Sequence, residues 1–253
     1  MGKNNSIREL DFTNSPYPPN YRNLANGLDL LASLPENSIK ASFFDPQYRG
    51  VLDHLNYGNE GKGRQLKRLE LPQMSTETIC TFITEIGRVL HPSGHLFLWL
   101  DKYSLATSNM NLWLKDAGLD VVDLITWDSG RFGMGSRSRC RAGYLLVLQK
   151  PPRRCKGCWT NHSIPDVWSE KVKKNHPHSK PLALQKALIE ATTSEGDWVL
   201  DPASGGYSVL QCCQQTGRNF IGCDLKFGNQ VHNDQFTANH NLEATGLKKL
   251  KEY

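Results

Sequence analysis

The segment from residue 197 to residue 224 constrains the fold more than any other part of the chain. It opens with the strand-like run Asp-Trp-Val-Leu, and a glycine-bearing turn at residues 201–208 follows directly. Residues 209–215 then have a helical pattern, and residues 219–224 form a second short apolar strand that ends in Asp224. A strand, a glycine turn, a helix and a second strand make up the unit from which parallel sheets are built.

The turn and the acid that follows it point to a bound nucleoside. Gly205 and Gly206 let the backbone approach a ligand closely, and the N-terminus of the following helix offers free N–H groups to a carboxylate or phosphate. Asp224 comes about 20 residues later, the spacing of a carboxylate that binds ribose hydroxyls. The alternative is a tight turn followed by an acid that caps a strand. We favour the nucleoside site because the three features occur together.

A second candidate site, Asp45-Pro46-Gln47-Tyr48, directly follows the apolar run of residues 41–44. The run predicts a buried strand, and α/β folds place ligands where such strands end. An acid, a proline-stiffened backbone and an aromatic ring within this short stretch can grip a flat heterocycle that carries an amino group. Because Asp and Pro are also common turn residues, an ordinary strand-end turn is the alternative.

Strand and helix patterns alternate along the chain, which predicts an α/β fold with a doubly wound, mostly parallel sheet in a single domain. Strands are expected at residues 40–44, 95–100, 121–127, 144–149, 198–200 and 219–223. Helices are expected at residues 105–117, 182–192 and 76–90, the last of them ending in a His-Pro-Ser-Gly turn at residues 91–94. Residues 145–148 are all apolar, so we expect their strand to be fully buried.

Composition narrows the class of protein further. The chain of 253 residues has no apolar stretch long enough for a membrane helix and lacks the start typical of a signal peptide. Seven cysteines are an odd number in a chain too large to need disulfides, which suits a reducing compartment and predicts a cytoplasmic protein. Cys155 and Cys158, with His162 nearby, resemble half of a zinc site. Because no second such pair follows, we expect no metal.

Basic residues are concentrated in one stretch of the sequence. Residues 129–180 contain twelve Lys or Arg against only Asp166 and Glu170, whereas the net charge of the whole chain is +5. Aromatic residues such as Phe132 are interleaved with them, and this mixture fits phosphate contacts combined with stacking on bases. We therefore predict a nucleic-acid partner. The residues expected to contact it are Arg131, Arg137, Arg139, Arg141, Arg153, Arg154, Lys156, Lys171, Lys173 and Lys174.

A second basic segment, residues 58–68, is expected to form a mobile loop over the site.

Together these motifs resemble those of the DNA amino-methyltransferases that use S-adenosylmethionine, in the branch whose catalytic motif comes first. Asp45-Pro46-Gln47-Tyr48 resembles the family's catalytic D-P-P-Y, and residues 176–184 resemble its H-P-x-x-K-P-x-x-L segment. Residues 201–208 are similar to D-P-F-x-G-x-G-T, and Asp224 stands where the family has its ribose-binding acid. The resemblance spans roughly residues 22–228, and its four segments occur in the family's order.

The resemblance implies a Rossmann-like methyltransferase fold with basic loop insertions, DNA as the partner and S-adenosylmethionine as the cofactor. It favours methylation of adenine N6, because family members with Asp first in the tetrapeptide mostly resemble adenine methylators. The Asp45 carboxylate and the Pro46 carbonyl would accept the hydrogens of the amino group. Gln47 would lie beside the base, and Tyr48 would stack on it once it has left the helix. N4-cytosine methylation, an RNA substrate and an inactive nucleic-acid-binding relative are the alternatives.

The resemblance also implies a cofactor site. Asp224 would bind the ribose, the backbone of the glycine turn would lie beside the nucleoside, and Ser208 would lie near the methionine carboxylate. Lys180 would support that carboxylate, with a surface lysine as the alternative, and Asn26 would touch the adenine. The complete set is Asn26, Lys180, Asp201, Pro202, Ala203, Ser204, Gly205, Gly206, Ser208 and Asp224.

Three departures separate this chain from the family pattern. Gln47 replaces the second proline of the catalytic motif, which frees one backbone angle there. Tyr207 stands where the family has glycine or a small residue, so we expect a reshaped cofactor turn. Residues 142–143 are Ala-Gly where the family often has His-Glu. None of these changes removes Asp45, Tyr48 or Asp224, and we therefore expect an active enzyme.

The order of the motifs divides the chain into parts. Residues 17–149 form the catalytic half, residues 150–175 a small basic recognition region and residues 176–228 the cofactor-binding part. They lie between a polar start, residues 1–16, with the composition of a disordered segment, and a tail at residues 229–253. Because so small a recognition region makes few base-edge contacts, we predict a short or relaxed target sequence. Affinity should then come mainly from phosphates and weaken steeply with salt.

Overall fold

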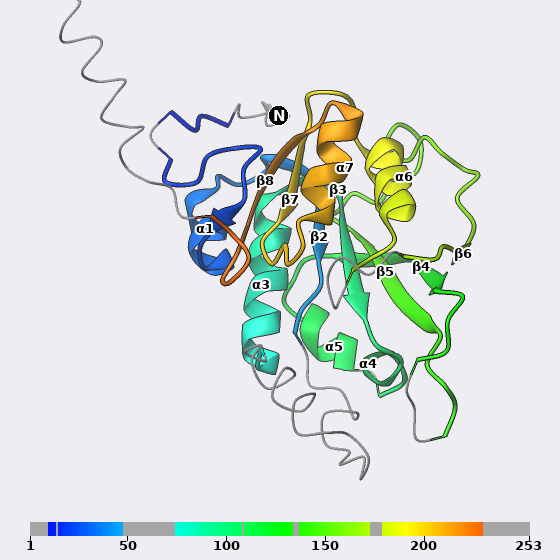
Figure 1. The fold of residues 1–253 in the computed structure, drawn as a ribbon. Coiled ribbons are helices and arrows are strands. Elements are labelled where there is room, and N and C mark those ends of the chain that lie inside the picture. Colours follow the sequence, from blue (N-terminus) through cyan, green and yellow to red (C-terminus); the bar gives the residue numbers. More distant parts are fainter. Residues whose placement is uncertain are drawn as a thin grey trace, which may run out of the picture.

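A computed structural model describes residues 10–13, 15–47, 74–107, 109–133, 137–172 and 179–229 of the protein. These residues form an eight-stranded sheet with the order β1-β8-β7-β2-β3-β5-β4-β6 (Figure 1). The strands are β1 (Asn23–Leu24), β2 (Ile39–Phe44), β3 (Leu90–Leu100), β4 (Asp120–Asp128), β5 (Ala142–Gln149), β6 (Val167–Ser169), β7 (Trp198–Asp201) and β8 (Asn219–Asp224). The helices are α1 (Gly27–Ser33), α3 (Thr76–Val89), α4 (Lys102–Ala106), α5 (Asn109–Leu114), α6 (Leu182–Thr192) and α7 (Ser208–Thr216). Strand β5 runs antiparallel to β3 and β4, while the other pairs are parallel, which confirms the predicted mostly parallel sheet.

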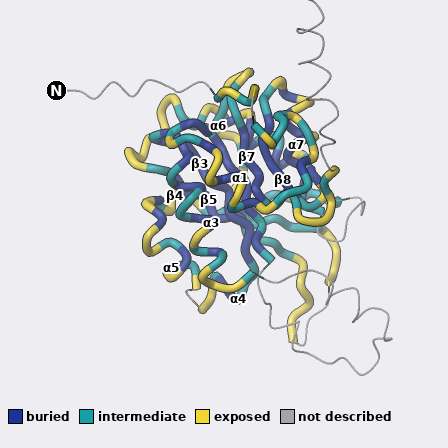
Figure 2. Tube along the Cα trace, turned by 90° about the vertical axis from the view of Figure 1, so that its left-hand side faces the viewer, coloured by how far each residue is buried: buried dark blue, intermediate teal, exposed yellow. Residues whose placement is uncertain are grey.

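Helices cover both faces of this sheet, as predicted for a doubly wound fold (Figure 1). Because successive side chains of a strand point to opposite faces, each strand feeds two separate cores. Phe44 and Leu98 belong to the core that includes α1, α3 and α5, whereas Phe43 and Phe97 belong to the core that includes α6 and α7. Figure 2 shows the central strands buried between these layers. Residues 145–148 are buried, as expected from their sequence.

Helix α3 forms where the sequence predicts it. The Ser75 side chain caps its N-terminus by accepting a backbone hydrogen bond at 3.1 Å. Ile79, Phe82 and Ile86 recur at helical spacing and are all buried against the sheet. The helix ends at Val89, one residue before the predicted end.

The expected turn at residues 91–94 is instead part of β3. Ile39 of β2 pairs with Leu90, whereas Ala41 pairs with His95, so β3 carries extra residues at this point and bulges out of register. Strand pairing resumes at His95, while residues 91–94 have no backbone pairing partner in the neighbouring strands. Ser93 adopts the left-handed conformation, with φ of 65°, so the bulge keeps a turn-like backbone within the bounds of β3, in line with its composition.

The predicted helix at residues 105–117 is wrong in its extent. Two short helices, α4 and α5, replace it, and α4 begins earlier because the Asp101 side chain accepts a hydrogen bond from the Ser104 N–H at 2.7 Å. Thr107 closes α4 by donating both its N–H and its hydroxyl to the Tyr103 carbonyl.

Strands β1 and β6 were not predicted, since two or three residues are too few to show a period of alternating apolar residues. Of the helices described, none is both long and apolar enough to cross a membrane.

Strands β2 and β7 lie side by side at the point where the winding of the sheet changes direction. From β7 the chain passes through α7 to β8, toward one edge, whereas from β2 it passes through α3 to β3, toward the other. The carboxyl ends of neighbouring parallel strands open into a crevice at such a point, which is where α/β folds bind ligands. The fold thereby brings Asp45 and the glycine turn together.

Candidate active site

A cavity of about 1090 Å³ lies at the carboxyl ends of β2, β7 and β8. Asp45 and Gln47 line it after β2, and every residue predicted to hold the cofactor lines it as well. Pro46 is buried next to them, and Tyr48 lies outside the described residues. The sequence had not pointed to several other lining residues, among them Trp99, Glu170, Gln185, Leu225 and Phe227. The two predicted sites therefore share one space.

The Asp45 carboxylate is held by a lysine from a distant part of the sequence. The Lys180 ammonium lies 2.5 Å from Asp45 Oδ2, and both side chains are largely buried. The same ammonium lies 5.2 Å from the centre of the Trp99 ring, at the end of β3. A charge-assisted hydrogen bond and a cation–π contact together fix the lysine between two strand ends. The structure thus places Lys180 on the acid of the tetrapeptide.

Glu170 anchors the start of α6, the helix that follows Lys180. Helix α6 starts two residues after Lys180, and its N-cap residue, Pro181, makes no side-chain cap. The Glu170 carboxylate takes over that function by accepting hydrogen bonds from the Ala183 and Leu184 N–H groups at 3.0 and 3.1 Å. Glu170 also accepts the Trp168 indole N–H at 2.8 Å. The acid ties the residues after β6 to the start of α6, an arrangement that sequence spacing alone does not reveal.

The backbone after Asp45 is anchored as well. The Gln47 carbonyl accepts a hydrogen bond from the Met74 N–H at 2.8 Å, which joins the end of the tetrapeptide to the residues that precede α3. The Gln47 side chain lines the cavity. The residue that departs from the family's second proline therefore adds a polar side chain at the site.

Tyr207 lies in the glycine turn, where the resemblance led us to expect glycine or another small residue. Tyr207 adopts the left-handed conformation, with φ of 57°, which glycine adopts without strain and other residues rarely do. Its ring is buried against Phe220, and its hydroxyl donates to the Asn23 carbonyl at 2.7 Å. The Arg22 guanidinium lies 5.4 Å from the ring centre. These contacts offset the local strain, and burial raises the pKa of the Tyr207 hydroxyl.

Asp201 is a buried acid at the start of the turn, only 6% exposed. One carboxyl oxygen accepts a hydrogen bond from the Ala203 N–H at 3.3 Å, so the side chain helps to shape the turn. Burial, together with the Asp45 and Asp224 charges, raises its pKa to about 8, although the Ala203 hydrogen bond and Lys180 oppose the shift. Near neutral pH the group therefore tends to keep its proton, which limits the negative charge inside the cavity.

Asp224 is fixed by backbone N–H groups. One carboxylate oxygen accepts a hydrogen bond from Gly205 at 2.9 Å, and the other accepts from Lys226 and Phe227 at 2.8 and 2.9 Å. The acid at the end of β8 is thus joined to the glycine turn after β7. Carboxylate oxygens carry further lone pairs, so a hydroxyl of a ligand can still bind. At the rim, Leu225 is 62% exposed and offers an apolar surface.

Helix α1 closes the cavity beside the turn. Asn26 caps this helix by accepting the Leu28 N–H at 2.9 Å, and it also lines the cavity. The next residue has to be glycine, because a Cβ atom at Gly27 would lie 2.2 Å from the Pro202 carbonyl oxygen. On the other side, α7 begins at Ser208 without a side-chain cap. Its first N–H groups suit a carboxylate ligand.

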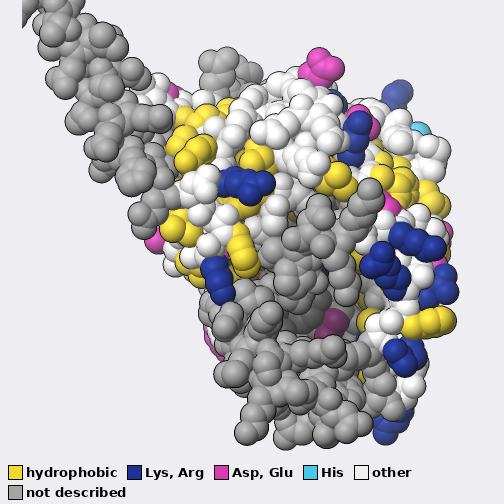
Figure 3. Space-filling view, in the orientation of Figure 1, with side chains coloured by type: hydrophobic (Ala, Val, Ile, Leu, Met, Phe, Trp, Pro, Cys, Tyr) yellow, Lys and Arg dark blue, Asp and Glu magenta, His cyan; other side chains and the backbone are white. Residues whose placement is uncertain are grey.

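The predicted DNA contacts separate into two groups at opposite ends of the sheet. Arg131, Arg137, Arg139 and Arg141 lie on the hairpin between β4 and β5, at the same end as the cavity, and Lys171 lines the cavity itself. Figure 3 shows Lys and Arg side chains gathered along the side of the molecule on which β4 and β6 lie. These residues can contact one ligand together with Asp45.

Arg153, Arg154 and Lys156 follow the antiparallel strand β5, which carries the chain back to the other end of the sheet. Arg153 lies 3.5 Å from the carboxylate of Asp120, the first residue of β4. Nine residues of β4 span about 30 Å, and that length separates this group from the hairpin. The basic stretch of the sequence is therefore not one surface. Lys173 and Lys174 lie outside the described residues.

Cys155 and Cys158 form a turn in which the Cys158 N–H donates to the Cys155 carbonyl at 3.0 Å. Within the described parts of the chain, no three His, Cys, Asp or Glu side chains gather as a metal site requires.

Comparisons with known proteins agree with this geometry. Residues 39–228 match the family model N6_N4_Mtase, described as DNA methylase. The chain is 57% identical over 211 residues to the type II methyltransferase M.HhaII of Haemophilus parahaemolyticus, which covers 83% of this chain and 92% of the relative. It is 26% identical to M.HpaI of Haemophilus parainfluenzae over 79% of this chain and 68% of the relative.

Solved structures share the fold at low sequence identity. The cytosine-N4-specific PvuII DNA methyltransferase superposes with a TM-score of 0.62 at 15% identity, covering 89% of this chain and 94% of the other. The complex of M1.HpyAVI with SAM superposes with a TM-score of 0.58 at 18% identity, covering 81% and 92%.

Proposed function

Because the chain belongs to the DNA methylase family whose model matches residues 39–228, we propose that it transfers a methyl group from S-adenosylmethionine to the N6 amino group of adenine in DNA. One observation carries the proposal. The Asp45–Lys180 ion pair and the glycine turn line the same cavity, although about 155 residues separate the acid from the turn. A group that holds the amino nitrogen and a group that holds the methyl donor thus share one space.

The residues around the turn fit S-adenosylmethionine. Asp224 is fixed by backbone N–H groups and keeps lone pairs for ribose hydroxyls, while Gly205 and Gly206 leave the backbone open. The start of α7, at Ser208, suits the carboxylate, and the exposed apolar rim at Leu225 suits the adenine. When bound, S-adenosylmethionine supplies a methyl group that is already activated by the positive sulfur.

The task left to the chain is alignment. The lone pair of an exocyclic amino group is delocalised into the ring, so the nitrogen is a poor nucleophile until its hydrogens are drawn out of the ring plane. The Asp45 carboxylate and the Pro46 carbonyl accept those two hydrogens and turn the lone pair toward the methyl group. Lys180 keeps the carboxylate in position, and Asp45 is placed to take the proton that the nitrogen loses after methylation.

Two observations bear on the substrate. Asp is the first residue of the tetrapeptide, as in the family members that resemble adenine methylators, and this favours adenine over cytosine. Of the described part of the recognition region, residues 150–172, the segment around β6 lies at the cavity end of the sheet. So small a surface supports the proposal of a short or relaxed target sequence, read in DNA within the cytoplasm.

We restrict the proposed DNA surface to the hairpin between β4 and β5 and to Lys171. These residues lie at the cavity end, whereas Arg153, Arg154 and Lys156 lie about 30 Å away at the far end of β4. A duplex that delivers a base to Asp45 would meet the hairpin first.

The test is to incubate the protein with unmethylated DNA and S-adenosylmethionine labelled in its methyl group, and to identify the methylated nucleoside by mass spectrometry. We expect labelled N6-methyladenine. Asp45→Ala should lower the rate at least a hundredfold, since it removes the group that aligns the nitrogen. Asp123→Ala, which removes an exposed carboxylate of β4, is the matched control and should leave the rate unchanged.

The outcomes that contradict the proposal are distinct. Labelled N4-methylcytosine would overturn the choice of base, and methylation of RNA alone would overturn the choice of DNA. Cofactor binding without methyl transfer would identify an inactive relative. Full activity of Asp45→Ala would show that the carboxylate has another role.

A further inference from the structure

Phe132 is the most exposed large apolar side chain in the described part of the molecule, at 71%. It lies on the hairpin between β4 and β5, directly after Arg131 in the sequence, and the Arg141 guanidinium lies near its ring in space. A lone apolar side chain on a surface is ordinary. Phe132, however, lies within a basic segment at the cavity end of the sheet, and the cavity is large enough for a nucleoside and a base. An exposed ring among cations suits contact with stacked bases.

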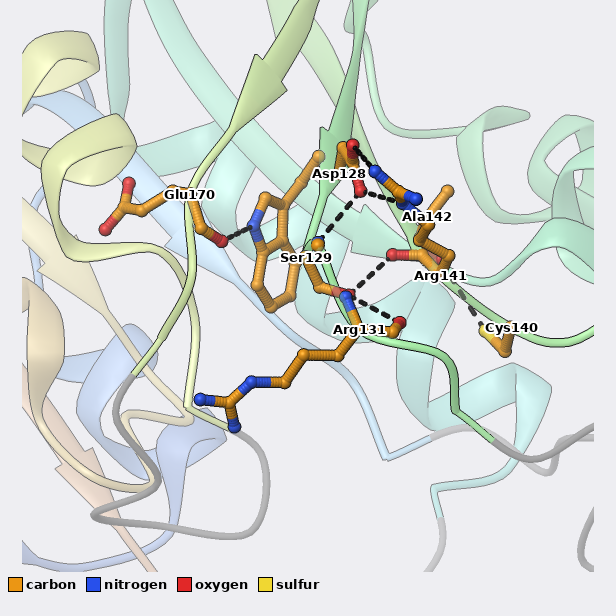
Figure 4. Close-up of polar contacts among 9 residues, drawn as sticks. Asp128, Ser129, Arg131, Cys140, Arg141, Ala142 and Glu170 are labelled. Carbon is orange, nitrogen blue, oxygen red and sulfur yellow. Dashed lines mark hydrogen bonds and ion pairs between the residues drawn. The ribbon is translucent and has the colours of Figure 1, made fainter.

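The base of the hairpin is firmly built. Arg141 makes two contacts with the Asp128 carboxylate, at 2.5 and 2.6 Å, and these hydrogen bonds lower the pKa of Asp128 to about 2. The Ser129 hydroxyl donates to the Arg141 carbonyl at 2.8 Å (Figure 4). Farther along the hairpin, the Gly133 N–H donates to the Cys140 carbonyl. Phe132 is therefore presented by an ordered frame, with the Arg141 guanidinium 5.8 Å from its ring centre.

The frame stands against the rim of the cavity. A Cβ atom at Gly130 would lie 2.9 Å from Lys171 Cε, and Lys171 lines the cavity. The Trp127 indole N–H donates to the Glu170 carbonyl at 2.9 Å and holds the end of β4 on the same rim. In Figure 4 the Arg131 side chain extends away from the Asp128–Arg141 pair. Phe132 thus lies two residues along the chain from Gly130, which adjoins a side chain that lines the cavity.

Other exposed apolar side chains lack this combination. Leu225 and Phe227 belong to the rim of the cofactor site, while Leu112 lies on α5 and Val121 on the far half of β4. Phe227 also has a neighbouring cation, with the Lys226 ammonium 6.0 Å from its ring centre, but it is only 37% exposed and lines the cavity itself. Phe132 differs from it in its greater exposure and in its place on the hairpin that carries Arg131, Arg137 and Arg139.

We propose that Phe132 is a wedge that enters the base stack of duplex DNA next to the target adenine, while Arg131, Arg137 and Arg139 contact the phosphates. The inference rests on the proposed function. A base must leave the helix before Asp45 can reach its amino group, and an apolar side chain inserted between bases replaces the stacking that is lost. The ring thereby makes the extruded state of the base more favourable. Methyl transfer itself does not involve Phe132.

The test compares Phe132→Ala, Phe132→Trp and Leu112→Ala on two substrates. One is a duplex that carries the site at which the wild type places its methyl group. The other is the same duplex with an abasic position opposite the target adenine, so that the base is already unpaired. Both phenylalanine variants should fold, because the side chain is exposed and contributes little to either core.

On the matched duplex, kcat/KM of Phe132→Ala should fall roughly tenfold to a hundredfold, and Phe132→Trp should retain most of the activity, since its ring also stacks. On the unpaired target the deficit should shrink to within about threefold. Leu112→Ala should match the wild type on both substrates. Fluorescence of 2-aminopurine at the target position should rise less with Phe132→Ala than with the wild type.

An equal loss on both substrates would overturn the wedge, because it would mean a role in general affinity. Unchanged activity of Phe132→Ala would overturn it as well. In either case, the wild-type activity would leave the proposed function standing. A wild type that methylates no DNA would overturn the proposed function and this inference together.

Discussion

The two ends of the sheet each hold a partly buried lysine, and the two lysines are used in different ways. At the end away from the cavity, Lys150 donates three hydrogen bonds, to Asn37 Oδ1 at 3.0 Å and to the carbonyls of Arg88 and Leu90 at 3.0 and 2.8 Å. At the cavity end, Lys180 contacts one carboxylate, that of Asp45, and the face of Trp99.

The partners of the two lysines indicate a structural role for Lys150 and a role at the cavity for Lys180. Each donor of Lys150 has an acceptor, and two of those acceptors are the carbonyls left open where α3 ends, so the lysine acts as a C-terminal cap of the helix. Lys180 instead orients a carboxylate that faces a cavity. Burial lowers the pKa of Lys150, but its bonds keep it in place. Substitution of the two lysines should therefore affect different measurements.

The largest effect is expected for Lys180→Met. Loss of the ammonium leaves Asp45 free to turn, so kcat should fall up to about a hundredfold, with little change in the midpoint of thermal unfolding. Lys180→Arg should recover part of the rate. If Lys180→Met instead raised KM for S-adenosylmethionine at unchanged kcat, the lysine would be a cofactor ligand, as the sequence suggested. That result would contradict the role in orienting Asp45 on which the comparison with Lys150 depends.

Lys150→Met should produce the opposite result. Three acceptors lose a charged donor, so the free energy of unfolding should fall by about 2 kcal/mol, measured by urea denaturation. The rate of methyl transfer per folded molecule should stay at the wild-type value. A variant as stable as the wild type would show that water replaces the lysine at this helix end.

The two ends should also differ, by a smaller amount, in their response to pH. Asp201, at the cavity end, has a pKa raised to about 8, so between about pH 4 and 8 the folded chain keeps a proton that the unfolded chain has lost. Its contribution to stability is present at low pH and is lost as the pH rises through this range. His95, the first paired residue after the bulge at the other end, has a pKa lowered to about 4 by burial, and its contribution is lost as the pH falls below 6.5.

Asp201→Asn keeps the oxygen that accepts the Ala203 N–H and removes the titration. The midpoint of thermal unfolding of this variant should therefore exceed that of the wild type by a margin that grows from pH 6 to pH 8. A constant margin would mean that the carboxyl is already ionised in the folded protein at pH 6.

Much of the fold follows from the sequence because it depends on local patterns. The strand at residues 219–223 and the helix at residues 182–192 were predicted within a residue of their observed ends, since apolar period and capping residues are readable locally. Each motif was expected at the carboxyl end of a parallel strand, and the pairing of β2 with β7 in the structure brings Asp45 and the glycine turn to the same cavity.

What the sequence did not reveal depends on long-range contacts. Lys180 contacts Asp45 from the residues before α6, whose start Glu170 caps, and no spacing in the sequence encodes either contact. The basic stretch looked like one surface because its residues are close in sequence. Antiparallel pairing of β5 sends Arg153 to the opposite end from Arg131, and strand direction cannot be deduced from composition.

Tyr207 has a consequence for how this family is recognised and redesigned. At this position the requirement is a backbone angle, φ near +57°, and here it is met by a buried ring and a hydroxyl bound to the Asn23 carbonyl. A search pattern that insists on glycine would pass over such chains, whereas a pattern written in dihedral angles would keep them. A design that introduces tyrosine at this position in a related protein should therefore also include the strand segment whose Asn23 carbonyl accepts its hydroxyl.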